Sequence, residues 1–123
     1  MKPLELTETN FAETVKSSQM LLVDFWAAWC GPCRNFAPVF DTAAGLHEDV
    51  VFGKVNTETQ QDLAAAAQIT SIPTLMAFKD GVLVYSRPGA LDSRGLEELV
   101  VSLKNLDMDA VHAELAAAQT SEP

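Results

Sequence analysis

The sequence contains no apolar run that approaches the length needed to cross a bilayer, and no repeat or low-complexity segment. Its start has no signal-peptide stretch, because an acidic residue, Glu5, already interrupts it. Only 6 glycines and 6 prolines occur among 123 residues, and 48% of the chain is hydrophobic, which is typical of a folded protein. We therefore expect one folded domain in the cytoplasm.

Basic residues are scarce. Eight lysines and arginines stand against 17 aspartates and glutamates, which gives a net charge of −9. A surface of this sign repels the phosphates of nucleic acids and anionic lipids, so neither is an expected partner. The acidity either keeps a small protein in solution or forms an acidic docking surface.

Cysteine is also scarce, and the two cysteines stand together in the segment WAAWCGPCRNFAP, residues 26–38. In the cytoplasm, cysteines act in catalysis or metal binding more often than as permanent crosslinks. A zinc site would need further ligands, and the sequence supplies His47 but no second histidine near residue 53. We therefore expect no metal here, and we expect His47 and the remote His112 to lie at the surface.

Strand and helix patterns alternate along the chain, which predicts an α/β fold around a mixed sheet. Strands are expected near the N-terminus and at residues 20–27, 50–56 and 74–87, the last a hairpin that turns at Asp80-Gly81. Helices are expected from about residue 10, from the cysteines to residue 46, at 59–69 and at 92–103.

Local signals refine three of these helices. Asn10 and Glu13 have the spacing of a capping box, and Asp92 or Ser93 is suited to begin the last helix. Pro38 should kink its helix without ending it, because the apolar spacing continues beyond it.

The cysteines fall between a buried strand and the helix that begins at or just after Cys30. The free backbone N–H groups and the dipole of a helix N-terminus stabilise a thiolate. The two-residue spacer places Cys33 one turn further, close enough to Cys30 for a small disulfide ring. Gly31 permits the tight bend that this ring needs, and Pro32 stiffens it.

Asp24 is unusual because it interrupts an apolar strand. Burial of a carboxylate is costly, since desolvation disfavours the charged form. Asp24 is therefore either a buried acid with a chemical role or a residue that faces solvent from an edge strand.

The motifs VDFWAAWCGPC, SIPT, FKDG and PGA, in this order and spacing, resemble the thioredoxin family over residues 4 to about 106. The resemblance implies a mixed five-stranded sheet flanked by four helices, in a thioredoxin domain at residues 1–106. Residues 107–123 would form a C-terminal extension with a short helix at about 107–118 and a frayed end at 120–123. Pro88 departs from the family, where an amide-bearing residue is commoner.

The resemblance also implies a protein-disulfide reductase with a redox-active disulfide. Cys30 would attack a substrate disulfide and Cys33 would resolve the mixed disulfide. Asp24 matches the family's buried acid, which is thought to take the proton from Cys33, and Lys54 matches the lysine near that acid. The implied substrate-contacting residues, including an Ile-Pro bond that is cis in the family, are Trp29, Gly31, Pro32, Ile72, Pro73, Gly89 and Ala90.

The expected partners follow from the same resemblance. A flavoprotein thioredoxin reductase that draws on NADPH would regenerate the dithiol, and disulfide-containing proteins would be the substrates of a monomer. The chain has no dinucleotide fingerprint, so we expect it to carry no cofactor. Two other functions stay open: an isomerase or dedicated oxidant, which the spacer without histidine disfavours, and a non-catalytic binding module within a larger assembly.

Overall fold

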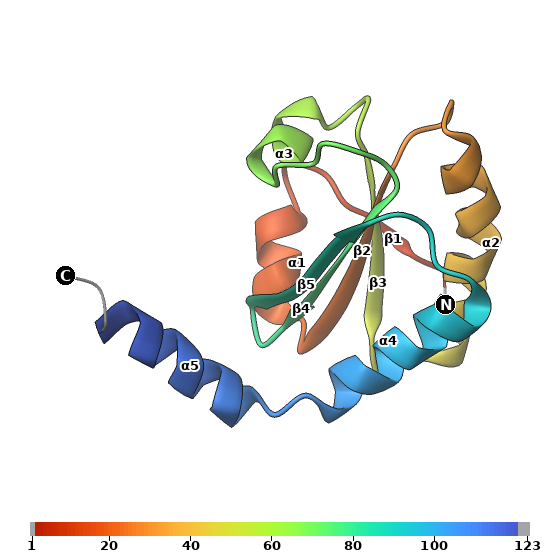
Figure 1. The fold of residues 1–123 in the computed structure, drawn as a ribbon. Coiled ribbons are helices and arrows are strands. Elements are labelled where there is room, and N and C mark those ends of the chain that lie inside the picture. The colour runs from red at the N-terminus through yellow and green to blue at the C-terminus, as the bar shows by residue number, and fades with distance from the viewer. Residues whose placement is uncertain (1, 121–123) are drawn as a thin grey trace.

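The five strands of the protein form one mixed sheet (Figure 1). The computed structural model describes residues 2–120. In spatial order the strands are β1 (Leu4–Glu5), β3 (Val51–Asn56), β2 (Met20–Trp26), β4 (Thr74–Lys79) and β5 (Val82–Pro88). β3 runs parallel to β1 and β2, whereas β4 runs antiparallel to β2 and β5. The predicted α/β fold with a mixed five-stranded sheet is confirmed.

Helices cover both faces of this sheet (Figure 1). They are α1 (Phe11–Ser17), α2 (Gly31–Leu46), α3 (Gln61–Ala66), α4 (Ser93–Asn105) and α5 (Met108–Thr120). α1 and α3 pack on one face, and α2 and α4 pack on the other. No helix within the described residues is long and apolar enough to span a membrane.

β2 is the central strand, and its side chains alternate between two apolar clusters. Leu21, Val23 and Phe25 belong to the cluster beneath α1 and α3, whereas Leu22 belongs to the cluster beneath α2 and α4. By the same alternation Asp24 faces α2. The central strand therefore delivers one carboxyl group to the face that carries the cysteines.

Three helix predictions can be compared with the structure. Asp92 begins α4, with its Oδ1 accepting the Gly95 N–H at 2.7 Å. Pro38 lies inside α2, which continues to Leu46 as expected. The capping box at Asn10 was wrong, because the Asn10 side chain turns back to accept the Thr7 N–H at 2.7 Å and caps no helical group.

The predicted hairpin is confirmed, with Asp80 and Gly81 at its turn. Both residues have positive φ, 52° and 78°, which a tight turn of this type requires. The helix expected at 59–69 is shorter than predicted and covers Gln61–Ala66. It is followed by Gln68, also at positive φ, which ends the helical path.

The expectation that His47 lies free at the surface was wrong. Its side chain is 11% exposed, and its Nε2 lies 2.7 Å from Glu97 Oε2. Its Nδ1 lies 2.9 Å from Lys104 Nζ, which also pairs with Asp49 at 3.0 Å. The histidine therefore joins the end of α2 to α4. His112 on α5 is exposed, as expected.

Lys79 at the end of β4 is buried, which the sequence analysis did not anticipate. Its ammonium group donates to the carbonyl oxygens of Leu103, Lys104 and Leu106 at 2.7, 3.0 and 3.1 Å. These carbonyls close α4, where the helix dipole is negative, so the charge is compensated in place. Lys79 thus fixes the point from which the chain continues into α5.

The predicted helix after residue 107 is present as α5, and it extends to Thr120. Met108 is 9% exposed, whereas Leu115 is 44% exposed, so the helix is anchored mainly at its start. Residues 121–123 of the predicted frayed end lie outside the described residues, and Thr120 still belongs to the helix. The division into a domain at 1–106 and an extension stays a prediction.

Deletion of residues 107–123 tests that division. We expect the free energy of unfolding to fall by about 1–3 kcal/mol, since burial of Met108 is lost while the Lys79 contacts to α4 remain. Disulfide-reduction turnover should stay within about twofold, because α5 lies far from the N-terminal end of α2, where the cysteines are (Figure 1). Denaturant melts and a turnover assay provide the measurements. A large loss of turnover with unchanged stability would contradict the division.

Candidate active site

The two cysteines lie at the start of α2, which follows β2 in the chain after a short loop. Cys30 is the N-cap of α2, and a disulfide joins its Sγ to that of Cys33, with the two Cα atoms 5.2 Å apart. The Cys33 N–H donates to Cys30 Sγ at 3.2 Å. A sulfur at this position receives the free N–H groups and the positive end of the helix dipole. The small disulfide ring predicted from the spacer is confirmed.

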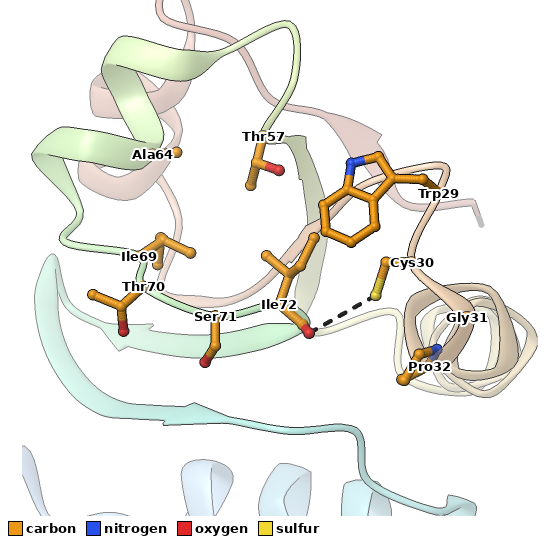
Figure 2. A pocket seen from close by; sticks show the side chains of 10 residues that line it. All are labelled: Trp29, Cys30, Gly31, Pro32, Thr57, Ala64, Ile69, Thr70, Ser71 and Ile72. Carbon is orange, nitrogen blue, oxygen red and sulfur yellow. Dashed lines mark hydrogen bonds between the residues drawn. The ribbon is translucent and has the colours of Figure 1, made fainter.

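The loop before β4 lies opposite the disulfide. The Ile72-Pro73 bond is cis, as the family resemblance implies. Cys30 Sγ lies 3.8 Å from the Ile72 carbonyl oxygen, the contact dashed in Figure 2. In the dithiol form the Cys30 S–H can donate to this oxygen. The Gly89 N–H donates to the Pro73 carbonyl at 2.7 Å, which ties the end of β5 to the same loop.

A pocket of about 430 Å³ opens beside Cys30 (Figure 2). Trp29 forms its rim and is 68% exposed. Four of the predicted substrate-contacting residues line this pocket: Trp29, Gly31, Pro32 and Ile72. The other three, Pro73, Gly89 and Ala90, do not line it.

The sequence analysis missed the far wall of this pocket. That wall comes from the turn after β3, from α3 and from the loop before the cis bond, and it consists of Thr57, Ala64, Ile69, Thr70 and Ser71. These residues are small, polar or aliphatic, and no charged residue lines the pocket. Only Ser71 belongs to a motif quoted above, SIPT; no local motif marks the other four, which the fold brings to Cys30.

Asp24 is fully buried, and neither of its carboxyl oxygens has a hydrogen-bond partner among residues 2–120. Burial raises the pKa of Asp24 to about 7; the nearby Lys54 charge opposes this rise, and the Asp41 charge on α2 adds to it. The alternative of a solvent-facing Asp on an edge strand is therefore wrong, because β2 is the central strand.

Lys54 stands directly opposite Asp24 in the pairing of β3 with β2. It is half-buried, and its Nζ lies 5.0 Å from the centre of the Trp26 ring. A cation over an aromatic face is held there by the ring quadrupole. The arrangement brings Lys54, Asp24 and Trp26 together on the side of the sheet that α2 covers.

Among residues 2–120, no group of three or more histidine, cysteine, aspartate or glutamate side chains is arranged to hold an ion. The chemistry available is that of two sulfurs at a helix N-terminus, one buried acid and one nearby lysine.

The comparison with known proteins agrees with this geometry. The family model described as thioredoxin matches residues 2–105. The chain belongs to the thioredoxin family. It is 47% identical over 116 residues to a putative thioredoxin 2 of Streptomyces coelicolor, a match that covers 94% of this chain and 87% of that protein. Thioredoxin 1 of Synechococcus elongatus is 49% identical over 88 residues, covering 70% of this chain and 82% of that protein.

A solved structure supports the same assignment. A mutant thioredoxin from Halobacterium salinarum NRC-1 superposes with a TM-score of 0.79 at 33% identity, covering 86% of this chain and 94% of its own. As a thioredoxin with a Cys30–Cys33 disulfide, the protein is a dithiol–disulfide reductase. The Streptomyces match covers 94% of this chain, so it must include part of α5. The family model ends at residue 105, before that helix begins.

The buried carboxyl group makes a prediction about stability. The folded pKa of Asp24, about 7, exceeds the unfolded value of about 3.9, so folding favours the protonated acid. This stabilising linkage is fully present below about pH 4 and is lost as the pH rises through 7. Above pH 7 the buried carboxylate therefore costs up to roughly 4 kcal/mol relative to the protonated form.

Asp24→Asn should consequently stabilise the protein at pH 8, by roughly 1–3 kcal/mol, because a neutral amide replaces the buried charge at some cost in unmet hydrogen bonds. The gain should shrink or vanish at pH 4.5, where Asp24 is already neutral. Denaturant melts of both proteins at the two pH values measure this. An equal effect at both pH values would contradict the raised pKa.

Proposed function

We propose that this thioredoxin reduces disulfide bonds of other proteins, with Cys30 as the attacking thiolate and Cys33 as the resolving thiol. The observation that carries this assignment is the place of Cys30: its sulfur caps α2, borders the pocket and faces the cis-proline loop. Cys33 is one turn deeper, is 2% exposed and does not line the pocket.

The proposed exchange has two steps. The Cys30 thiolate attacks one sulfur of the substrate disulfide, forms a mixed disulfide and releases the other substrate sulfur as a thiolate. The Cys33 thiolate then attacks Cys30 Sγ, which expels the second substrate thiolate and forms the Cys30–Cys33 disulfide. Two electrons pass to the substrate, and the helix N-terminus stabilises the thiolate that begins the reaction.

Asp24 is proposed to accept the proton of Cys33 in the second step. Its carboxyl group faces α2, on which Cys33 lies, and a pKa of about 7 suits a proton acceptor near neutral pH. Both carboxyl oxygens of Asp24 are buried from the protein surface. Lys54 is proposed to stabilise the carboxylate that remains until the proton arrives.

Substrate binding is proposed at the rim of the pocket. The Ile72 backbone would pair with an extended substrate segment, while Trp29, Gly31 and Pro32 offer a surface with little charge. Pro73, Gly89 and Ala90 are proposed to border that segment on the other side; the hydrogen bond from the Gly89 N–H to the Pro73 carbonyl keeps Gly89 beside the cis-proline loop.

Regeneration of the dithiol is assigned to an NADPH-linked thioredoxin reductase, and the proposed location is the cytoplasm, where thiols are kept reduced. The protein would there carry electrons from the reductase to oxidised proteins and so contribute to cell redox homeostasis. A non-catalytic binding module is disfavoured, since a structural role would not need a disulfide that borders an open pocket.

Single cysteine variants test the division of labour. Cys33→Ser leaves Cys30 able to attack but removes the resolving thiol, so substrates should accumulate as mixed disulfides. Cys30→Ser should trap at least tenfold less, because Cys33 is buried away from the pocket. Mass spectrometry after exposure to an oxidised protein substrate, with the double serine variant as the blank, measures trapping. Equal trapping by the two single variants would contradict the assignment.

A further inference from the structure

Three charged residues stand in one row across β1, β3 and β2. The strand register pairs Glu5 with Lys54, and the same Lys54 with Asp24. Paired residues on neighbouring strands share a face of the sheet and have backbones about 5 Å apart. Lys54 therefore stands between an exposed carboxylate at the sheet edge and a buried carboxyl group at its centre.

A pocket at the β1 edge brings Glu5 and Lys54 together a second time. This pocket of about 260 Å³ is lined by both residues and by Pro3, Leu4, Trp26 and Asn56. Within residues 2–120 no ion pair holds Lys54 Nζ, which lies over the Trp26 ring. Its flexible side chain can therefore lean outward to Glu5 or inward to Asp24.

The charges that face Asp24 directly come from two elements. Lys54 faces it from β3 and Asp41 acts on it from α2, while its partner on β4 is the uncharged Leu75. Cys33, whose proton the proposed function assigns to Asp24, also lies on α2 and is held in the disulfide in this structure. Glu5 stands one strand further away, with Lys54 between, so its influence on Asp24 passes mainly through the lysine.

We propose that Glu5 is a positioning residue for the reductase reaction: it draws the Lys54 ammonium group toward the β1 edge and so limits its contact with the Asp24 carboxylate. The proposal extends the proposed role of Asp24. Loss of the Glu5 charge releases Lys54 toward Asp24, which favours the carboxylate. The direction is therefore fixed: neutralising Glu5 lowers the pKa of Asp24 and moves the resolving step to lower pH.

The first test is the titration of Asp24 in the oxidised protein, followed by NMR of its carboxyl carbon. In Glu5→Gln the midpoint should move to lower pH by roughly 0.3–1 unit, the size expected for one charge at about 10 Å in a partly screened site. Glu5→Asp, which keeps the charge, should stay near wild type. The matched control is Glu8→Gln, an equal loss of charge at an exposed residue outside the row. Equal shifts in Glu5→Gln and Glu8→Gln would overturn the proposal.

The second test asks whether the effect passes through Lys54. In a Lys54→Met background, Glu5→Gln should shift the Asp24 midpoint by less than a third of its effect in wild type. Asp41→Asn, which removes a charge that acts on Asp24 directly, should lower the midpoint in both backgrounds. A Glu5→Gln shift that survives intact without Lys54 would overturn the proposal, since the lysine would then carry none of it.

The kinetic test separates this inference from the proposed function. The rate of mixed-disulfide resolution is measured against pH by stopped flow, and its midpoint in Glu5→Gln should move to lower pH with the NMR midpoint. If Asp24→Asn leaves that rate and its pH dependence unchanged, the proposed proton acceptor is wrong, yet the NMR titration still decides whether Glu5 positions Lys54. If the NMR midpoint does not move in Glu5→Gln, the positioning role is wrong whatever Asp24 does.

Discussion

The desolvation of a single carboxyl group is the constraint on which the site depends. Asp24 lies in the central strand, fully buried and without a hydrogen-bond partner, where an ionised acid is strongly disfavoured. The central strand holds it there, because its neighbours along β2, Val23 and Phe25, belong to the apolar core. The same strand leads into the loop that ends at Cys30, so the position of β2 determines both where the acid lies and where the disulfide lies.

Weak electrostatic interactions can change the ionised fraction of Asp24 near neutral pH, because burial has already raised its pKa to about 7. Lys54 on β3 opposes the effect of burial, and Asp41 on α2 adds to it. A small change in either interaction then alters the fraction of Asp24 that is ionised near neutral pH. The same change would not alter the ionised fraction of an exposed acid with a pKa near 4, because that acid is already fully ionised at neutral pH. The proposed role of Glu5 extends this dependence to a charge at the edge of the sheet.

The sequence predicted those features that local patterns determine. The strands at the apolar runs, the helix after Cys30 and the turn at Asp80-Gly81 each follow from a few neighbouring residues. Asp24 was recognisable because it breaks an apolar run. The cis state of the Ile72-Pro73 bond came only from the family resemblance. The far wall of the pocket, the buried Lys79 and the contacts of His47 depend on residues distant in the chain, and no pattern in one sequence specifies such pairs.

Lys79 determines where α5 begins relative to the disulfide, because it binds the last carbonyls of α4. Its register partner is Met20, at the end of β2 that is opposite to Cys30. At about 3.3 Å per residue, the length of β2 separates this point from the active site by roughly 20 Å. The ammonium group fixes the last carbonyls of α4 to the sheet, so the start of α5 is held at the end of the sheet that lies far from the disulfide.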